Sequence, residues 1–419
     1  MRKVLAAVVV LTCLNLISFS FAEKGFAQEP ERQGPPRNIV LIGWDGAGRA
    51  NIHECLARGE LPTLKQLSEE GALVEIDIIT GATDTKAGWT QILTGYHPEV
   101  TGVFSNSRFK DVPEGLSVFE RLKQHFGPEF ACLAVIGKSG NVGEVRAPFK
   151  RKLTDQEAEE ILAAQKEARR ARQKAQAAEG QKPAGQPRLR PRQIQGQVVE
   201  EDGVKFLVFG GSPYFTMHKV CDVWEFGLAL DERVGTRAIE VLEKYKDRPF
   251  FFFIHFAEVD SQGHKYGENS EQYKAALISN DTWTGKIIAK LKELSLYEHT
   301  LVYVTADHGF NEGATGHSYA PYVFLATNDP LVKRGGMRQD IAPTILARFG
   351  LDLSKFEPTL DGEPLTQPAT KPVLKAPEAP PSQRRAASRP QGQGGIEERP
   401  QRQASRRADQ RETAQSTAN

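Results

Sequence analysis

Residues 38–46 read NIVLIGWDG, an apolar run that ends in an acidic residue and a glycine. A continuous apolar run, rather than an alternation of apolar and polar residues, is typical of a strand that is covered on both faces of its sheet. Similar runs recur at residues 130–136, 204–209, 249–256 and 300–305. We predict that these five segments are strands of one buried central sheet.

Helical patterns lie between several of these runs, for example at residues 61–70 and 273–294. Strands that alternate with helices favour a mostly parallel sheet, because each parallel connection has to cross back along the sheet. The sequence therefore predicts an α/β fold with three layers, α/β/α, in one core domain at residues 36–366.

Residues 150–200 interrupt this alternation. Thr154-Asp-Gln-Glu157 is a capping-box sequence, and the Ala-rich, charged helix that it begins has almost no apolar face. A Pro- and Arg-containing linker follows the helix. We expect a solvent-exposed helical insertion, which is either a lid over the substrate or a spacer without a role.

The N-terminal segment predicts export. Arg2 and Lys3 precede an apolar run at residues 4–21, and Ser20-Phe21-Ala22 offers a cleavage site. This pattern is typical of a signal peptide at residues 1–22, with cleavage as late as residue 27; a retained membrane anchor is the alternative. We expect a periplasmic or secreted protein that has no transmembrane span once the signal peptide is removed.

The charge of the chain limits its partners. A formal net charge of +1 gives no general attraction to nucleic acid, and we identify no nucleic-acid-binding module. Residues 367–419 contain ten Lys+Arg, five Asp+Glu and almost no large apolar residues, so they predict a disordered tail. The tail is either free in solvent or in contact with anionic cell-envelope polymers.

Asp and His residues gather directly after three of the predicted strands. Ligands of open α/β sheets bind beyond the carboxyl ends of the strands, so these side chains are expected to share one site. Three Asp and three His suit a borderline divalent ion such as zinc. They are too many for one catalytic ion with an open position, but they fit two ions that share a substrate. The six residues are Asp45, Asp260, His264, Asp307, His308 and His317.

A segment at residues 83–95 that contains four threonines follows the predicted helix at residues 61–70. By position alone, Thr85 would be an ordinary helix cap. The run Thr85-Lys-Ala-Gly-Trp-Thr-Gln-Ile-Leu-Thr-Gly95, however, resembles the nucleophile segment of the alkaline-phosphatase superfamily, which includes nucleotide pyrophosphatase/phosphodiesterases and sulfatases. The resemblance covers roughly residues 38–365, and further landmarks of that superfamily appear in order along this range. They are Asp45-Gly46, Asp260-Ser-Gln-Gly-His264, Ala306-Asp-His-Gly309, His317, Asp340-Ile-Ala-Pro-Thr344 and Asp361-Gly362.

The resemblance implies an alkaline-phosphatase-like fold and a two-metal hydrolase that cleaves a small-molecule phosphate ester. Thr85 would be the nucleophile and would form a phospho-Thr85 intermediate that water hydrolyses. Coordination to a divalent ion would lower the pKa of the hydroxyl group, so no separate general base is needed. The implied ligands are Asp45, Thr85, Asp307 and His308 for one ion, and Asp260, His264 and His317 for the other.

Two residues bear on the type of ester. Asn106 lies 21 residues after Thr85, where the phosphodiesterase branch places an Asn that donates to a phosphate oxygen; otherwise it is a turn residue. Lys138 stands where some phosphomonoesterases carry a Lys, although Gly140 replaces their Arg two residues on; a solvated lysine is the alternative. We predict a phosphodiester substrate, with a phosphomonoester or a phosphonate as alternatives.

Two other functions are less favoured by the residues. A threonine cannot be converted to formylglycine, so Thr85 disfavours sulfatase activity. Lys86 stands where typical phosphodiesterases carry an aromatic residue, so nucleotide specificity is not predicted; Lys86 either binds a phosphate or lies on the surface. A non-catalytic protein that binds cell-wall polymers through its tail is the remaining alternative, and the intact ligand set argues against it.

Overall fold

A computed structural model describes residues 34–179 and 196–376 of the chain. The predicted signal peptide, residues 180–195 of the predicted insertion and residues 377–419 of the predicted tail lie outside these ranges. Within them, no helix has both the length and the apolar content that crossing a lipid bilayer requires.

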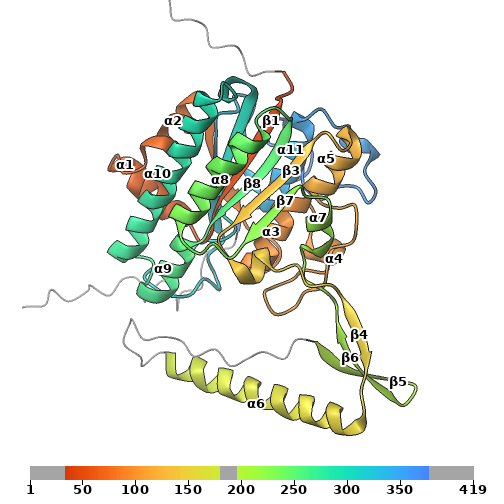
Figure 1. Cartoon of the computed structure of the whole chain (residues 1–419). Helices are drawn as coiled ribbons and strands as arrows, with labels where there is room; N and C mark the ends of the chain where they lie inside the picture. Colours follow the sequence, from red (N-terminus) through yellow and green to blue (C-terminus); the bar gives the residue numbers. More distant parts are fainter. Residues whose placement is uncertain (1–33, 180–195, 377–419) are drawn as a thin grey trace, which may run out of the picture. The chain divides into compact units, whose positions relative to one another are not determined.

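An eight-stranded sheet forms the centre of the fold, in the order β11-β2-β10-β9-β1-β8-β3-β7 (Figure 1). β10 runs antiparallel to its neighbours β9 and β2, and the other pairings in this sheet are parallel. Every residue of β1, β3, β8 and β9 is buried, as their unbroken apolar runs predict. The strands are β1 (Asn38–Trp44), β2 (Ala72–Asp77), β3 (Ala131–Ile136), β7 (Val223–Phe226), β8 (Phe250–Phe256), β9 (Thr300–Thr305), β10 (Tyr322–Thr327) and β11 (Gly336–Met337).

Helices cover both faces of this sheet (Figure 1). Successive side chains of a strand point to opposite faces. Trp44 of β1 donates to Thr284 of α10 at 3.2 Å, whereas a Cβ atom at Gly43 would lie 2.2 Å from the Trp89 ring of α3. α10 and α3 therefore lie on opposite faces, and the predicted three-layer α/β/α fold is confirmed.

The α-helices of the core are α1 (Arg49–Ala57), α2 (Pro62–Glu70), α3 (Thr85–Thr94), α4 (Pro98–Thr101), α5 (Val118–Phe126), α7 (Phe215–Lys219), α8 (Asp231–Tyr245), α9 (Glu258–Tyr266), α10 (Glu271–Glu293) and α11 (Ile341–Arg348). Short helical turns of other types are η1 (Ser139–Gly143), η2 (Tyr297–His299), η3 (Arg338–Asp340) and η4 (Leu353–Lys355).

A second, three-stranded antiparallel sheet lies within the chain between β3 and β7. Its strands are β4 (Phe149–Lys152), β5 (Gln197–Glu201) and β6 (Val204–Phe209), in the order β4-β6-β5. α6 (Asp155–Glu179) follows β4 in the chain and begins with the predicted capping box. Thr154 Oγ1 accepts from the Glu157 backbone amide, and the Glu157 carboxylate accepts from the Thr154 backbone amide.

The prediction that residues 204–209 belong to the central sheet is wrong. In β6 only Leu207 and Phe209 are buried, and the other four side chains are partly exposed. The apolar run therefore contains a strand with one covered face, to which Leu207 and Phe209 point, whereas Val204, Phe206 and Val208 point to the other face.

Candidate active site

The predicted ligands lie at one edge of the central sheet. Asp45 follows β1, whereas Asp307 and His308 follow β9. α9 follows β8 after one residue and carries Asp260 and His264. Because β1, β8 and β9 are parallel neighbours, their carboxyl ends meet at the same edge.

The six side chains form two groups. In each group, ligand atoms from three residues lie within 4.8 Å of one another. Apart from Thr85, these are the two sets that the resemblance implied. One group is Asp45, Asp307 and His308, and the other is Asp260, His264 and His317.

The three histidines are held in one tautomer. Each Nδ1 lies against a backbone carbonyl oxygen: His264 against Thr315 at 2.9 Å, His308 against Gly309 at 2.9 Å and His317 against Thr83 at 2.6 Å. A carbonyl oxygen only accepts, so each Nδ1 carries a proton, and in the neutral ring each Nε2 presents a lone pair. This arrangement of the second nitrogen is characteristic of histidines that bind metals.

The free lone pairs converge. His264 Nε2 lies 3.2 Å from His317 Nε2, so two acceptors face each other. His308 Nε2, Asp260 Oδ1 and Asp307 Oδ2 are buried and have no hydrogen-bond partner among the described residues. Buried acceptors without donors are costly, and a cation among them would satisfy all of these atoms. The residues therefore fit a metal centre.

The charges in the cluster also favour cations. Lys138 Nζ contacts Asp45 at 2.7 Å and Asp260 at 2.9 Å. Burial alone would raise the pKa of Asp45, but the Lys138 ammonium lowers it to about 2. Burial, aided by the Asp45 charge, raises the pKa of Asp307 well above its ordinary value. Three carboxylates face one ammonium group, so the site has room for additional positive charge.

The hydroxyl of Thr85 faces this cluster. Asp84, rather than Thr85, is the N-cap of α3: its carboxylate accepts from the amides of Ala87 at 3.3 Å and Asn106 at 2.7 Å. Thr85 is the first helical residue, and its Oγ1 accepts from Lys138 Nζ at 3.0 Å. The interpretation of Thr85 as only a helix cap is therefore wrong.

Asn106 and Lys138 both lie beside Thr85. Asn106 Oδ1 accepts from the backbone amide of Lys86 at 2.8 Å, so its Nδ2 remains available, without a partner among the described residues. The side chain of Lys138 is only 16% exposed. The alternative of a solvated strand-end lysine is wrong, because three oxygen atoms of the site surround its ammonium group.

Lys86 is buried as well, with 6% of its surface exposed. Its Nζ donates to Asn141 Oδ1 at 2.5 Å and lies 4.4 Å from the centre of the Phe109 ring. Burial lowers the pKa of Lys86 to about 8. The alternative of a surface role for this residue is wrong.

Sequence reasoning missed His255 as a functional residue, because a histidine in a buried strand is most simply a core residue. It lies in β8 beside Gly43 of β1, is fully buried, and its Nε2 is 2.9 Å from Asp45 Oδ2. One signal was present: His255 is the one polar residue in the run FFFFIHF, next to the carboxyl end of the strand.

Two further residues hold the backbone near the candidate ligands Asp45 and Asp307. The Tyr273 hydroxyl donates to the Gly46 carbonyl at 2.8 Å and accepts from the Gly48 amide at 3.1 Å, so it fixes the turn after Asp45. The fully buried guanidinium of Arg338 donates to the Asp307 carbonyl at 2.8 Å and to two carbonyls of the loop before α3. Neither residue gave a sequence signal.

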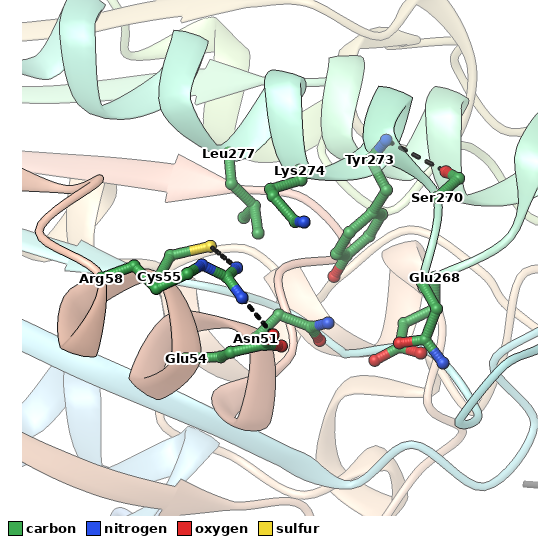
Figure 2. A pocket seen from close by; sticks show the side chains of 10 residues that line it. Asn51, Glu54, Cys55, Arg58, Glu268, Ser270, Tyr273, Lys274 and Leu277 are labelled. Atoms are coloured by element: carbon green, nitrogen blue, oxygen red, sulfur yellow. Dashed lines mark hydrogen bonds and ion pairs between the residues drawn. The ribbon is translucent and has the colours of Figure 1, made fainter.

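Figure 2 shows a separate hollow between α1 and α10. None of the predicted site residues lines it, so it is separate from the candidate active site. Tyr273 links the two places, because its ring borders the hollow and its hydroxyl bonds to the turn after Asp45. The lining residues are Asn51, Glu54, Cys55, Arg58, Glu268, Asn269, Ser270, Tyr273, Lys274 and Leu277.

The chain is similar to known proteins over most of its core. The sequence profile of the type I phosphodiesterase / nucleotide pyrophosphatase family matches residues 39–344. Human ectonucleotide pyrophosphatase/phosphodiesterase family member 1 is 33% identical over 96 residues, which are 23% of this chain and 10% of the relative. The 2,3-bisphosphoglycerate-independent phosphoglycerate mutase of Natronomonas pharaonis is 30% identical over 135 residues, 29% of this chain and 25% of the relative.

Among solved structures, a protein in the alkaline phosphatase superfamily from Vibrio parahaemolyticus aligns with a TM-score of 0.48 and 17% identity, covering 82% of this chain and 72% of that one. The chain spans only a tenth of the length of the first of these curated relatives and a quarter of the second.

Proposed function

The chain belongs to the type I phosphodiesterase / nucleotide pyrophosphatase family, and we propose that it hydrolyses phosphate esters with Thr85 as the nucleophile. One observation supports this proposal most directly. Three imidazoles and three carboxylates bring their ligand atoms together in two neighbouring groups, and the buried Thr85 hydroxyl lies beside them, in contact with Lys138. The substrate of this proposed activity is a small-molecule ester, most simply a phosphodiester.

The proposed cofactors are two zinc ions, because mixed imidazole and carboxylate donors suit zinc. Bound there, the ions would supply Lewis-acid activation of the Thr85 hydroxyl and neutralise charge on the transferred phosphoryl group. One ion would be held by Asp45, Thr85, Asp307 and His308, and the other by Asp260, His264 and His317.

The residues of the chain have distinct roles in the proposed reaction. Thr85 Oγ attacks phosphorus and becomes esterified as the leaving alcohol departs, and water then hydrolyses phospho-Thr85 to release phosphate or a phosphomonoester. Asn106 Oδ1 accepts from the backbone amide of Lys86, and this bond orients the side chain. Asn106 Nδ2 donates to a non-bridging phosphate oxygen. His255 and Arg338 hold Asp45 and Asp307 in place.

A phosphomonoesterase is the second candidate, and Lys138 is the observation that favours it. Its ammonium group lies 3.0 Å from Thr85 Oγ1, where it can pair with the additional negative charge of a monoester. A phosphonate hydrolase would use the same groups. The ratio of turnover of bis-p-nitrophenyl phosphate to that of p-nitrophenyl phosphate separates the first two candidates, and phosphonoacetate tests the third.

The covalent step is tested with Thr85→Ala in the zinc-loaded protein. We expect kcat to fall by at least about a thousandfold, whereas zinc content stays near that of the wild type, because the six Asp and His ligands remain. Thr85→Ser, which keeps a hydroxyl group, is the matched control and should retain measurable turnover.

Two results would count against the proposal. Unchanged turnover of Thr85→Ala would refute the covalent mechanism. Inactivity of the wild-type protein on all three substrates, together with fewer than one zinc ion per chain, would favour a non-catalytic binding protein instead.

Export is part of the proposed function and is supported by the pattern of residues 1–22 in the sequence. Sequencing the N-terminus of protein recovered from the periplasm or the medium tests it. A mature chain that begins between residues 23 and 28 is expected, and an N-terminus at Met1 contradicts it.

A further inference from the structure

Lys86 follows the proposed nucleophile directly, and its charge has no use in the reaction described above. We propose that Lys86 and Asn141 form an oxyanion-binding subsite beside Thr85, and that the preferred substrate is a phosphate ester whose retained alcohol carries its own carboxylate or phosphate. This inference rests on the proposed function, because it names the class of ester that the same site prefers.

The main chain at Lys86 is fixed on both sides. Its amide donates to Asn106 Oδ1 at 2.8 Å, and its carbonyl accepts from the Tyr214 hydroxyl at 3.2 Å. The side chain extends to Asn141 Oδ1 at 2.5 Å and over the ring of Phe109. The ammonium group is therefore held at a defined place, near enough to Lys138 for the two charges to interact.

The charge of Lys86 is not neutralised directly. Among the residues that the structure describes, no carboxylate oxygen lies within 4.0 Å of its Nζ. Asp84 and Glu144 are the acidic residues that act on it from farther away. Asp84 already accepts from two backbone amides, and Glu144 accepts from Arg146 at 2.8 Å. A buried ammonium without an anionic partner is costly, so an anion from outside the chain stabilises it.

The subsite has donors to spare. Asn141 Oδ1 accepts one of the three hydrogens on Lys86 Nζ, so two remain for a ligand. The Asn141 Nδ2 group has no hydrogen-bond partner in the described part of the chain. Asn141 adopts a left-handed φ of 68° within η1, a conformation that asparagine tolerates better than most residues. Together these N–H groups match the two oxygens of a carboxylate or of a phosphate.

Lys86 serves a group other than the phosphorus under attack. Lys138 Nζ contacts the nucleophile and a carboxylate of each ligand group. In the described structure, Lys86 Nζ makes no hydrogen bond or ion pair with Thr85 or with any of the six ligands. The two lysines therefore have different roles: Lys138 binds at the reacting phosphoryl group, and Lys86 binds the charged group on the retained alcohol of the ester.

Three chromogenic diesters test the inference in the full-length, zinc-loaded protein. They are the p-nitrophenyl phosphate esters of propanol, of 3-hydroxypropanoic acid and of 2-hydroxyethyl phosphate. The first two have nearly the same size and differ in one negative charge, and the third distinguishes a second phosphate from a carboxylate. Release of p-nitrophenol gives kcat/KM for each ester.

The wild-type protein should prefer at least one of the charged esters to the propyl ester by about tenfold in kcat/KM. Lys86→Met should lower kcat/KM for that ester about tenfold more than for the propyl ester. Lys86→Arg, which keeps the charge, should recover part of the preference. Lys110→Met, which removes an exposed lysine from the neighbouring segment, should leave the preference intact.

Lys86→Gln keeps a donor toward Asn141 without the charge, and it replaces the Met variant if that variant melts early. Equal losses on charged and propyl esters in folded Lys86 variants would overturn the subsite while leaving the proposed hydrolase intact. A wild-type preference for the propyl ester would overturn the subsite in the same way. Inactivity of the wild type on all three esters would instead reject the proposed function and this inference with it.

Discussion

His255→Phe separates a core residue from a residue that positions a ligand. The phenyl ring keeps the size of the side chain and its packing, since the His255 ring lies 5.3 Å from Trp89 and 6.1 Å from Phe253 between ring centres. The variant loses the hydrogen bond from His255 Nε2 to Asp45 Oδ2, which is 2.9 Å long. His255→Gln keeps an amide donor at about the same reach and is the matched control.

The size of the effect follows from that one bond. Both residues are fully buried, and a hydrogen bond to a charged group contributes about 1.5–3 kcal/mol. Since each 1.4 kcal/mol is tenfold in an equilibrium constant, this corresponds to about a 10- to 150-fold loss, in line with the effect of removing a residue that orients a metal ligand. The loss should fall on the ion held with Asp45, because His264 and His317 do not contact His255.

Titration of zinc against a chromophoric chelator measures the affinities of both ions. We expect one affinity to fall within that range in His255→Phe and the other to change less than about threefold, whereas His255→Gln stays close to the wild type. If the two affinities of His255→Phe equal those of the wild type, Asp45 does not depend on His255, and the assignment of Asp45 as a ligand loses its support.

Two further changes test buried charges around the site. Burial and the nearby Glu258 raise the pKa of Asp231 to about 8, against about 3.9 in an unfolded chain. The folded protein therefore binds more protons between these values, so the stability that Asp231 contributes is complete below about pH 4 and is lost as the pH rises through about 8. In the wild type, ionisation of this group should lower the stability by about 2–3 kcal/mol between pH 6 and pH 9. Asp231→Asn cannot ionise, so thermal melts of the variant should show a smaller drop over the same pH range. An equal drop in both proteins would contradict the raised pKa. Arg338→Met leaves the carbonyls of Asp307, Thr80 and Ala82 without this donor, each at a cost of about 1–3 kcal/mol. Urea unfolding should show a loss of stability of at least about 3 kcal/mol, and the loss in Arg338→Lys should be intermediate. A loss below about 1 kcal/mol in Arg338→Met would mean that water replaces the guanidinium.

The central sheet was predictable because burial on both faces leaves a mark in the sequence. β1, β8 and β9 are read directly from unbroken apolar runs, and their parallel order follows from the helices between them. β6 has a similar composition but lies in the second sheet. Its neighbours β4 and β5 are short and rich in charge, so nothing in the run itself shows that its partners lie within the insertion.

The clustering of the candidate ligands was predictable for a different reason. Asp45, Asp307 and the histidines each follow a strand, so the topology alone brings them to one edge. The residues that hold them are not marked in this way. Arg338 reaches Asp307 across 31 positions of the chain, and Tyr273 reaches Gly46 across 227. Such contacts depend on how helices pack on the sheet, which the periodicity of a single segment does not specify.

Lys138 shows what the geometry adds to a list of ligands. Its ammonium group contacts Asp45 from one ligand group, Asp260 from the other, and Thr85 between them. Burial alone would lower its pKa, but the carboxylates of Asp260 and Asp45 outweigh burial and raise it. The lysine thus holds together carboxylates that would otherwise repel one another. Two zinc ions would relieve the same repulsion, and a cation held by either group would compete with Lys138 for a carboxylate, Asp45 in one group and Asp260 in the other.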